Sequence, residues 1–165
     1  MGNNFIKYIL WFLVIVWMVV IFALSNTSAN KSSNDSRNVF GGMVNISTKI
    51  TNSIGITNFS RNDLKIIINN YNGLFREFMH SFVYFVLVIL LLLALKYSDM
   101  DYECIISLFI CLIYALSDEV HQIFISGRTF QLIDLFLDLL GVLFGIILYK
   151  LIYINKIKNL RHVKL

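Results

Sequence analysis

Residues 82–95 read FVYFVLVILLLLAL, an apolar stretch that no charged residue interrupts. With its flanks it extends over 78–97, the length that a helix needs to cross the hydrocarbon core of a bilayer. Three further segments have the same apolar character: 6–24, 103–123 and 132–154. The sequence therefore predicts an all-α protein of one domain, 1–165, whose four helices form a bundle integral to a membrane.

The composition supports this prediction. Hydrophobic residues make up 58% of the 165 residues and charged residues only 15%, with a mean hydropathy of +0.72. Soluble domains have roughly 45–50% apolar and about 25% charged residues, and a core of this size cannot bury the excess. The chain has no proline, the residue that most strongly breaks helices, so long uninterrupted helices are favoured.

The first apolar segment has one alternative interpretation, a secretory signal peptide. Lys7 precedes its uncharged core, and Ala23-Leu24-Ser25 resembles a cleavage site. Its uncharged run from Ile9 to Leu24 is, however, longer than the usual signal-peptide core of about 7–15 residues. We therefore expect a retained transmembrane helix.

A long loop, 25–77, rich in Ser, Asn and Thr, separates the first two predicted helices. Apolar residues recur in it at helical spacing, first as Val39, Met43, Ile46 and Ile50 after the cap Ser36, then as Leu64, Ile67, Ile68, Tyr71 and Phe75 after Asn62. We expect a partly helical loop whose two amphipathic segments lie on the membrane surface or against the bundle. The pair Gly41-Gly42 weakens the first of these segments.

Basic residues indicate the orientation in the membrane. The end of the last helix and the basic tail, 155–165, carry Lys150, Lys156, Lys158, Arg161 and Lys164. By the positive-inside rule the C-terminus is cytoplasmic, and with four spans the N-terminus is cytoplasmic too. Six basic residues spread through the long loop oppose this orientation. The tail lacks interleaved aromatic residues, so we expect no nucleic-acid partner.

Ionisable groups collect at the ends of the predicted helices. Such a group costs about 2.5–3.5 kcal/mol at the centre of a membrane helix unless it is paired, shallow or hydrated, so these groups mark a candidate site. Its members are Glu77, His80, Tyr84, Asp118, Glu119, His121, Gln122, Arg128, Asp134 and Asp138. Topology places all of them on one side of the membrane. Gly141 and Gly145 continue the acidic face of the last helix with a spacing that lets a neighbouring helix approach closely.

At these residues the sequence resembles the VanZ-like family of small membrane proteins. The block Asp118-Glu119-Val-His121-Gln122, the Gly127-Arg128 turn and the acidic helix start at Asp134 look like the longest signature of that family. The stretch Arg76-x-x-x-His80-x-x-x-Tyr84 fits its second-helix motif, and Ser25, Ser32 and Ser36 resemble its serine-studded entry to the loop. The resemblance implies a four-helix protein of the cell membrane of bacteria, mostly Gram-positive, with relatives that confer low-level resistance to the glycopeptide antibiotic teicoplanin.

Several positions depart from the pattern of that family. The chain has Glu77 where a lysine is common, Ser81 where phenylalanine stands, Val83 where an acid is common, Ser126 in place of proline and Asp138 in place of asparagine. Glu77 and Asp138 make the site more acidic. The ligand preference of the family therefore does not carry over directly.

We expect the site to bind a membrane lipid or an envelope component. Arg128 supplies a bidentate fork for phosphate at headgroup depth, while Tyr84 and the apolar walls accommodate a chain. The excess of acidic groups requires a ligand of mixed polarity, such as a cell-wall precursor or a glycopeptide. The sequence identifies no cofactor.

Two alternatives stay open. The first is an intramembrane enzyme acting on a lipid-linked substrate, whose candidate metal ligands or acid–base groups are His80, His121, Glu119, Asp118 and Asp134. No catalytic or metal-binding motif supports it, and Cys104 and Cys111, about 10 Å apart along one helix, provide neither a disulfide nor a zinc site. The second is a structural knot, with Arg128 paired to Asp118 or Glu119 and His80 bonded to Asp134 or Asp138.

Overall fold

The computed structural model is all-helical over the residues it describes, 2–56 and 58–162; side chains are described for 4–56 and 58–153. Its helices are α1 (Gly2–Ser25), α2 (Ala29–Ser53), α3 (Arg61–Lys96), α4 (Glu103–Gln122) and α5 (Leu132–His162). The predicted all-α class is therefore confirmed, with five helices in place of four.

Four of these helices, α1, α3, α4 and α5, are long and apolar enough to cross a membrane. Their outward faces remain apolar, since Phe12, Phe109 and Phe144 are each more than half exposed. Large exposed aromatic side chains on every face of a bundle are expected where lipid, not water, is the solvent. The described residues thus contain four helices of membrane-spanning length and apolarity, as predicted, and the third, predicted over 103–123, is observed as Glu103–Gln122.

The apolar stretch 82–95 lies at the centre of the bundle. Helix α3 contacts α1, α2, α4 and α5, and its Leu87, Val88 and Leu92 are completely buried. A helix that is apolar all round is buried on several faces, whereas an amphipathic one is buried on a single face. The composition of this stretch therefore explains why α3 is the central helix.

Small residues bring α3 and α5 into close contact. A Cβ atom added to Gly141 would lie 2.0 Å from the carbonyl oxygen of Ser81, and one added to Gly145 would lie 2.4 Å from Cγ1 of Val88. Only glycine fits at either position. The glycine spacing noted in the sequence thus lies at the α3–α5 contact, where two backbones approach closely.

Hydrogen bonds between helices hold α1 in place. Trp11 donates from Nε1 to Oγ of Ser98 at 3.0 Å, and Trp17 donates from Nε1 to the carbonyl of Val83 at 2.9 Å. The hydroxyl of Tyr114 on α4 donates to the carbonyl of Met18 at 2.5 Å. The two tryptophans therefore fix α1 against α3 and the turn that follows it.

The predicted loop, 25–77, is in fact a helical hairpin made of α2 and the first part of α3. The span predicted over 78–97 and the amphipathic segment before it form one helix, which no proline interrupts. This helix begins after Ser60, whose side chain accepts a hydrogen bond from the backbone of Asp63 while the Asp63 carboxylate accepts one from the Ser60 backbone. Such a capping box fixes the start of a helix.

Helix α2 begins at Ala29, earlier than the predicted cap Ser36, and continues through Gly41 and Gly42. Packing against α3 offsets the low helix propensity of the two glycines. Gly41 is buried, with Cδ1 of Ile68 at 3.4 Å from the place where its Cβ would be. The rings of Phe40 and Phe75 also stack, with their centroids 5.0 Å apart.

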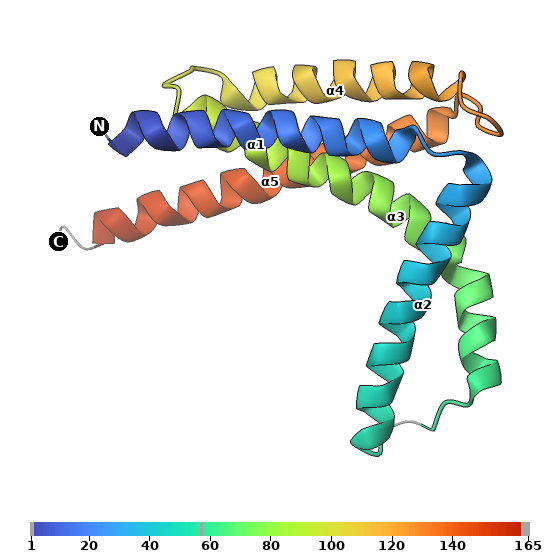
Figure 1. Cartoon of the computed structure of the whole chain (residues 1–165). Coiled ribbons are helices and arrows are strands. Elements are labelled where there is room, and N and C mark those ends of the chain that lie inside the picture. Colours follow the sequence, from blue (N-terminus) through green and yellow to red (C-terminus); the bar gives the residue numbers. More distant parts are fainter. Residues whose placement is uncertain (1, 57, 163–165) are drawn as a thin grey trace.

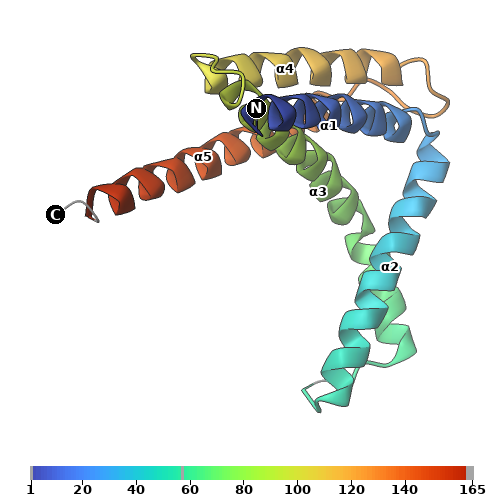
Figure 2. The same cartoon turned by 60° about the vertical axis from the view of Figure 1, so that its left-hand side comes forward.

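Helices α1 and α4 run side by side, α5 and the membrane-spanning part of α3 are inclined to them, and the hairpin of α2 and the first part of α3 is turned steeply away from this direction (Figures 1 and 2). The start of α1 and the end of α5 both lie on the side of the molecule remote from α2 (Figure 1), and the two ends are well separated (Figure 2). Helix α5 extends to His162, so most of the predicted tail, 155–165, is helical, and residues 163–165 of that tail lie outside the described residues.

Candidate functional site

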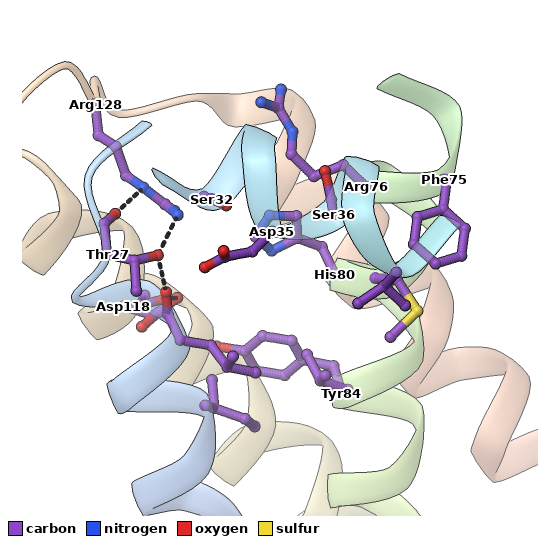
Figure 3. Close-up of a pocket in the computed structure, with 16 residues that line it drawn as sticks. Thr27, Ser32, Asp35, Ser36, Phe75, Arg76, His80, Tyr84, Asp118 and Arg128 are labelled. Carbon is purple, nitrogen blue, oxygen red and sulfur yellow. Dashed lines mark hydrogen bonds between the residues drawn. The ribbon is translucent and has the colours of Figure 1, made fainter. Parts of the chain in front are cut away.

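A cavity of about 220 Å³ lies where α2 crosses the end of the bundle. Most of its wall is apolar, and its charged side chains are Asp35, Arg76, Asp118 and Arg128. Figure 3 shows Arg76 and Arg128 toward one end of the cavity and the ring of Tyr84 toward the other. The complete lining is Ile21, Leu24, Ser25, Thr27, Ser32, Asp35, Ser36, Val39, Phe75, Arg76, Met79, His80, Val83, Tyr84, Asp118 and Arg128.

A second, mostly polar cavity of about 140 Å³ adjoins the first. Its lining is Ala29, Ser32, Arg76, His80, Gln122, Gly127, Arg128, Thr129, Gln131 and Asp134. The start of the α3 span, the end of α4 and the start of α5 therefore meet at one level, as the topology predicts. Four residues line both cavities: Ser32, Arg76, His80 and Arg128.

The turn between α4 and α5 positions Arg128. Gly127 has φ +76°, a left-handed conformation that glycine adopts without strain. The guanidinium of Arg128 then reaches the connection between α1 and α2, where Nε donates to the carbonyl of Thr27 at 3.0 Å and Nη2 to its Oγ1 at 3.5 Å. In the described residues Arg128 makes neither of the ion pairs that the knot alternative predicts, with Asp118 or with Glu119.

Burial lowers the pKa of the Arg128 guanidinium, and the positive charge of nearby Arg76 acts in the same direction, while Asp118 raises it. An arginine nevertheless stays protonated in proteins. The site thus holds two guanidinium groups that line the same two cavities, and among the described residues Arg128 uses only two of its five N–H donors.

Asp118 closes the inner side of the larger cavity. Its Oδ2 accepts hydrogen bonds from Oγ of Ser25 at 2.6 Å and from Nε2 of Gln122 at 3.2 Å, and Gln122 also donates to Ser25 at 3.4 Å. All three side chains are buried. This triad joins the end of α1 to the last turn of α4.

Glu119 has a different partner, although it is the next residue. Its carboxylate accepts a hydrogen bond from the backbone of Gln131 at 3.0 Å, just before α5 begins. Only 1% of Glu119 is exposed. Its negative charge therefore lies at the N-terminal end of α5, where the helix dipole favours an anion.

Four of the predicted site residues line neither cavity: Glu119, whose partner is given above, Glu77, His121 and Asp138. The ring of His121 packs on Phe22 with centroids 4.7 Å apart, and its buried Nε2 has no hydrogen-bond partner in the described part of the chain. Asp138 is 2% exposed and its Oδ1 is likewise unpartnered there. Among the described residues His80 has no hydrogen bond to Asp134 or Asp138, so this pairing of the knot alternative is also not observed.

Sequence reasoning missed several cavity residues. Arg76 and Glu77 precede His80 by four and three residues, spacings that both allow a shared helix face, yet only Arg76 lines the cavities. Arg76, Ser25 and Ser32 belong to the family resemblance but not to the predicted site, and neither Thr27 nor Asp35 is predicted. The helical spacing of Arg76 with His80 and Tyr84 is the sequence feature that could have identified Arg76 as a cavity residue.

The candidate metal ligands are not brought together. Across the described residues, no three His, Cys, Asp or Glu side chains are grouped closely enough to hold a metal ion. Cys104 and Cys111 are both free. The acid–base form of the enzyme alternative stays a prediction.

The fold and these cavities are those of a multi-pass membrane protein that has two adjoining cavities, one mostly apolar and one mostly polar, at one end of its spans. The sequence model of the VanZ/LLP1 family matches residues 10–153, which is most of the chain. The chain therefore belongs to the VanZ/LLP1 family. No curated protein and no solved structure matches it significantly.

Proposed function

We propose that this protein binds an amphiphile of the bacterial cell envelope in the two adjoining cavities. One observation carries the proposal: an apolar cavity and a polar cavity share Arg76, His80 and Arg128. An amphiphile has the same division, with an apolar chain joined to a polar headgroup. The shared cationic residues lie where the headgroup would be.

The charges favour a headgroup that carries an anionic group. Two neighbouring guanidinium groups repel each other in a partly buried site unless an anion lies between them. Arginine also binds phosphate or carboxylate through two parallel hydrogen bonds. Asp35 and Asp134 line the cavities as well, so a headgroup that also has hydroxyl, amide or amine donors fits better than a simple anion.

The apolar cavity suits the chain of the amphiphile. Val39 of α2, Leu24 of α1 and Met79 of α3 contribute to its wall, and Tyr84 lines it farther into the bundle. Burial of apolar chain atoms against such a wall contributes roughly 0.8 kcal/mol for each methylene group. Phosphatidylglycerol and lipid-linked cell-wall precursors are both of this chemical class.

The membership of the VanZ/LLP1 family supports a role in low-level resistance to glycopeptides such as teicoplanin. With both termini in the cytoplasm the cavities face the outer leaflet, the side from which an antibiotic outside the cell approaches the membrane. Lys7, Lys96 and Lys150 belong to the helix ends at the opposite side and are consistent with that orientation in the bacterial cell membrane. Binding of an envelope amphiphile would then change how much of it the antibiotic can reach.

Binding is tested with the purified protein in detergent, using phosphatidylglycerol as the probe and native mass spectrometry as the measurement. Arg128→Ala and Arg76→Gln are expected to weaken binding about tenfold or more, because each removes charge-assisted hydrogen bonds of about 1.5–3 kcal/mol. Arg61→Gln is the control, since Arg61 is exposed and lies outside both cavities. Equal losses in all three variants would contradict the proposal.

Resistance is tested separately by expressing the protein in a teicoplanin-sensitive Gram-positive host. The wild type and Arg61→Gln are expected to raise the inhibitory concentration of teicoplanin, while Arg128→Ala inserts into the membrane and does not. Amphiphile binding without any change in the inhibitory concentration would refute the resistance role and leave the binding role standing.

A further inference from the structure

An apolar stripe runs along α2, and none of the described residues covers it. Val39, Met43, Ile46 and Ile50 follow one another at spacings of four, three and four residues, which puts them on one helix face. Each is more than half exposed. Apolar faces of this kind mark a surface of interaction.

The position of the cavity shows which way this stripe faces. Ser32, Ser36 and Val39 line the larger cavity, and Met43, Ile46 and Ile50 continue the same face beyond it. The first half of the face therefore covers the end of the bundle. The second half faces the same side of the hairpin but lies beyond the edge of the bundle.

A second stripe runs along α3. Tyr71, Leu74, Phe78 and Phe82 are spaced by three, four and four residues and are all exposed. Phe78 and Phe82 also stack, with their ring centroids 6.1 Å apart. This stripe begins in the hairpin and continues without interruption into the lipid-facing surface of the membrane span.

The two stripes lie on the same side of the hairpin. The contact between α2 and α3 uses other faces, marked by the stacking of Phe40 on Phe75 and the packing of Gly41 on Ile68. Viewed along each helix from its N-terminus, the stripe is rotated about the helix axis by roughly a third of a turn from this contact. The direction of this rotation is the same for α2 and α3. Because the two helices are antiparallel, equal rotations bring both stripes to one side.

The charge of the hairpin complements anionic lipid. The stretch 29–75 contains five basic residues, Lys31, Arg37, Lys49, Arg61 and Lys65, against the two acidic residues Asp35 and Asp63. Lys31 and Lys49 are exposed beside the stripe of α2. A helix with an apolar face and basic flanks is typical of segments that lie in the plane of a membrane surface.

From these observations we infer that the α2–α3 hairpin lies on the surface of the membrane that the bundle spans. Its two stripes enter the boundary between headgroups and acyl chains, and its lysines contact anionic headgroups. The hairpin is turned steeply away from the direction of α1 and α4, as this arrangement requires (Figures 1 and 2). The membrane thereby holds α2 over the larger cavity, whatever ligand that cavity takes.

Spin labels on α2 test this inference in the full-length protein. Cys104→Ser removes the half-buried native cysteine, and fully buried Cys111 is kept. Met43→Cys and Ile46→Cys then place a label on the stripe, while the matched controls Asn38→Cys and Asn45→Cys place one on an exposed polar side of the same helix. The proteins are reconstituted in phosphatidylcholine vesicles that contain a minority of phosphatidylglycerol.

The measurement is the accessibility of each label to oxygen, which partitions into lipid, and to a water-soluble nickel chelate. We expect the stripe labels to be accessible to oxygen and protected from the chelate, and the control labels to show the reverse. Four labels that are all open to the chelate would overturn the inference. If the stripe labels were inaccessible to both reagents and showed spin–spin broadening between copies, the stripe would contact a second copy of the chain. That result would also overturn the inference.

Discussion

The hydroxyl of Ser25, the last residue of α1, donates a hydrogen bond of 2.6 Å to Oδ2 of Asp118, near the end of α4. The two residues are 93 positions apart in the sequence, and both are buried. The bond therefore joins two membrane helices at the level of the cavity. It also satisfies one oxygen of a carboxylate that would otherwise be costly to bury.

Ser25→Ala should destabilise the protein by about 1.5–3 kcal/mol, the usual contribution of a hydrogen bond to a charged acceptor. Thermal unfolding in detergent, followed by the fluorescence of Trp11 and Trp17, measures the change. Ser117→Ala is the matched control, because Ser117 is exposed on α4 and its hydroxyl donates only within its own helix. If both variants unfold at the same temperature, the Ser25–Asp118 bond contributes nothing to stability.

Gly141→Ala should disrupt the packing of α3 on α5. The new Cβ would lie 2.0 Å from the carbonyl oxygen of Ser81, and backbone cannot rotate away as a side chain can. We expect a loss of about 1–3 kcal/mol or more, seen as a lower unfolding temperature. Gly42→Ala, where no atom lies within 4 Å of the new Cβ, should instead gain about 0.5–1 kcal/mol from helix propensity. A Gly141→Ala protein as stable as the wild type would show that the helices are not in close contact.

Replacing Glu119 should affect the start of α5. Glu119→Ala leaves the backbone N–H of Gln131 without its acceptor, at a cost of about 1–3 kcal/mol. Glu119→Gln keeps an oxygen acceptor and should cost less, because only the charge is lost. Hydrogen exchange of the first turn of α5 reports the effect, with faster exchange in the alanine variant than in the glutamine variant. If exchange were equally fast in both variants and faster than in the wild type, the charge of Glu119 alone would matter. Wild-type exchange in both would contradict any role of Glu119 at the start of α5.

Ser60→Ala removes the capping box at the start of α3. The Ser60 hydroxyl donates to the Asp63 carboxylate at 2.7 Å and accepts from the Asp63 backbone at 3.3 Å. Its loss should destabilise the first turn by about 0.5–2 kcal/mol and increase hydrogen exchange there, while the membrane-spanning part stays protected. Ser53→Ala, at the end of α2, should leave exchange in that turn unchanged. Fraying that spread into the span would contradict a purely local role.

Local patterns were sufficient to locate the spans. The apolar stretch 82–95 predicted the central helix, and the segment predicted over 103–123 matches α4, since an uninterrupted apolar run of bilayer length has few alternatives to a helix. The hairpin was only half predicted. Its apolar periodicity was visible, but Gly41-Gly42 obscured the continuity of α2, which depends on packing against Ile68 of α3.

The site was harder to predict because side chains one residue apart on a helix point in directions about 100° apart. Arg76 and Glu77 are neighbours in sequence, yet only Arg76 lines the cavities. Asp118 and Glu119 likewise diverge, one to Ser25 and the other to Gln131. Topology alone predicts that these residues share a level of the membrane, and the rotation of each helix decides which of them meet.

The sequence by itself determined that this chain is a helical membrane protein whose polar residues gather at one end, because apolar run length and helix connectivity are properties of the chain. The tertiary structure alone decided that α2 crosses that end and covers an amphipathic cavity with Ser32, Asp35 and Val39. The physical reason is that the course of α2 depends on contacts with α3, such as Phe40 on Phe75. No local periodicity encodes contacts between residues so far apart in the sequence.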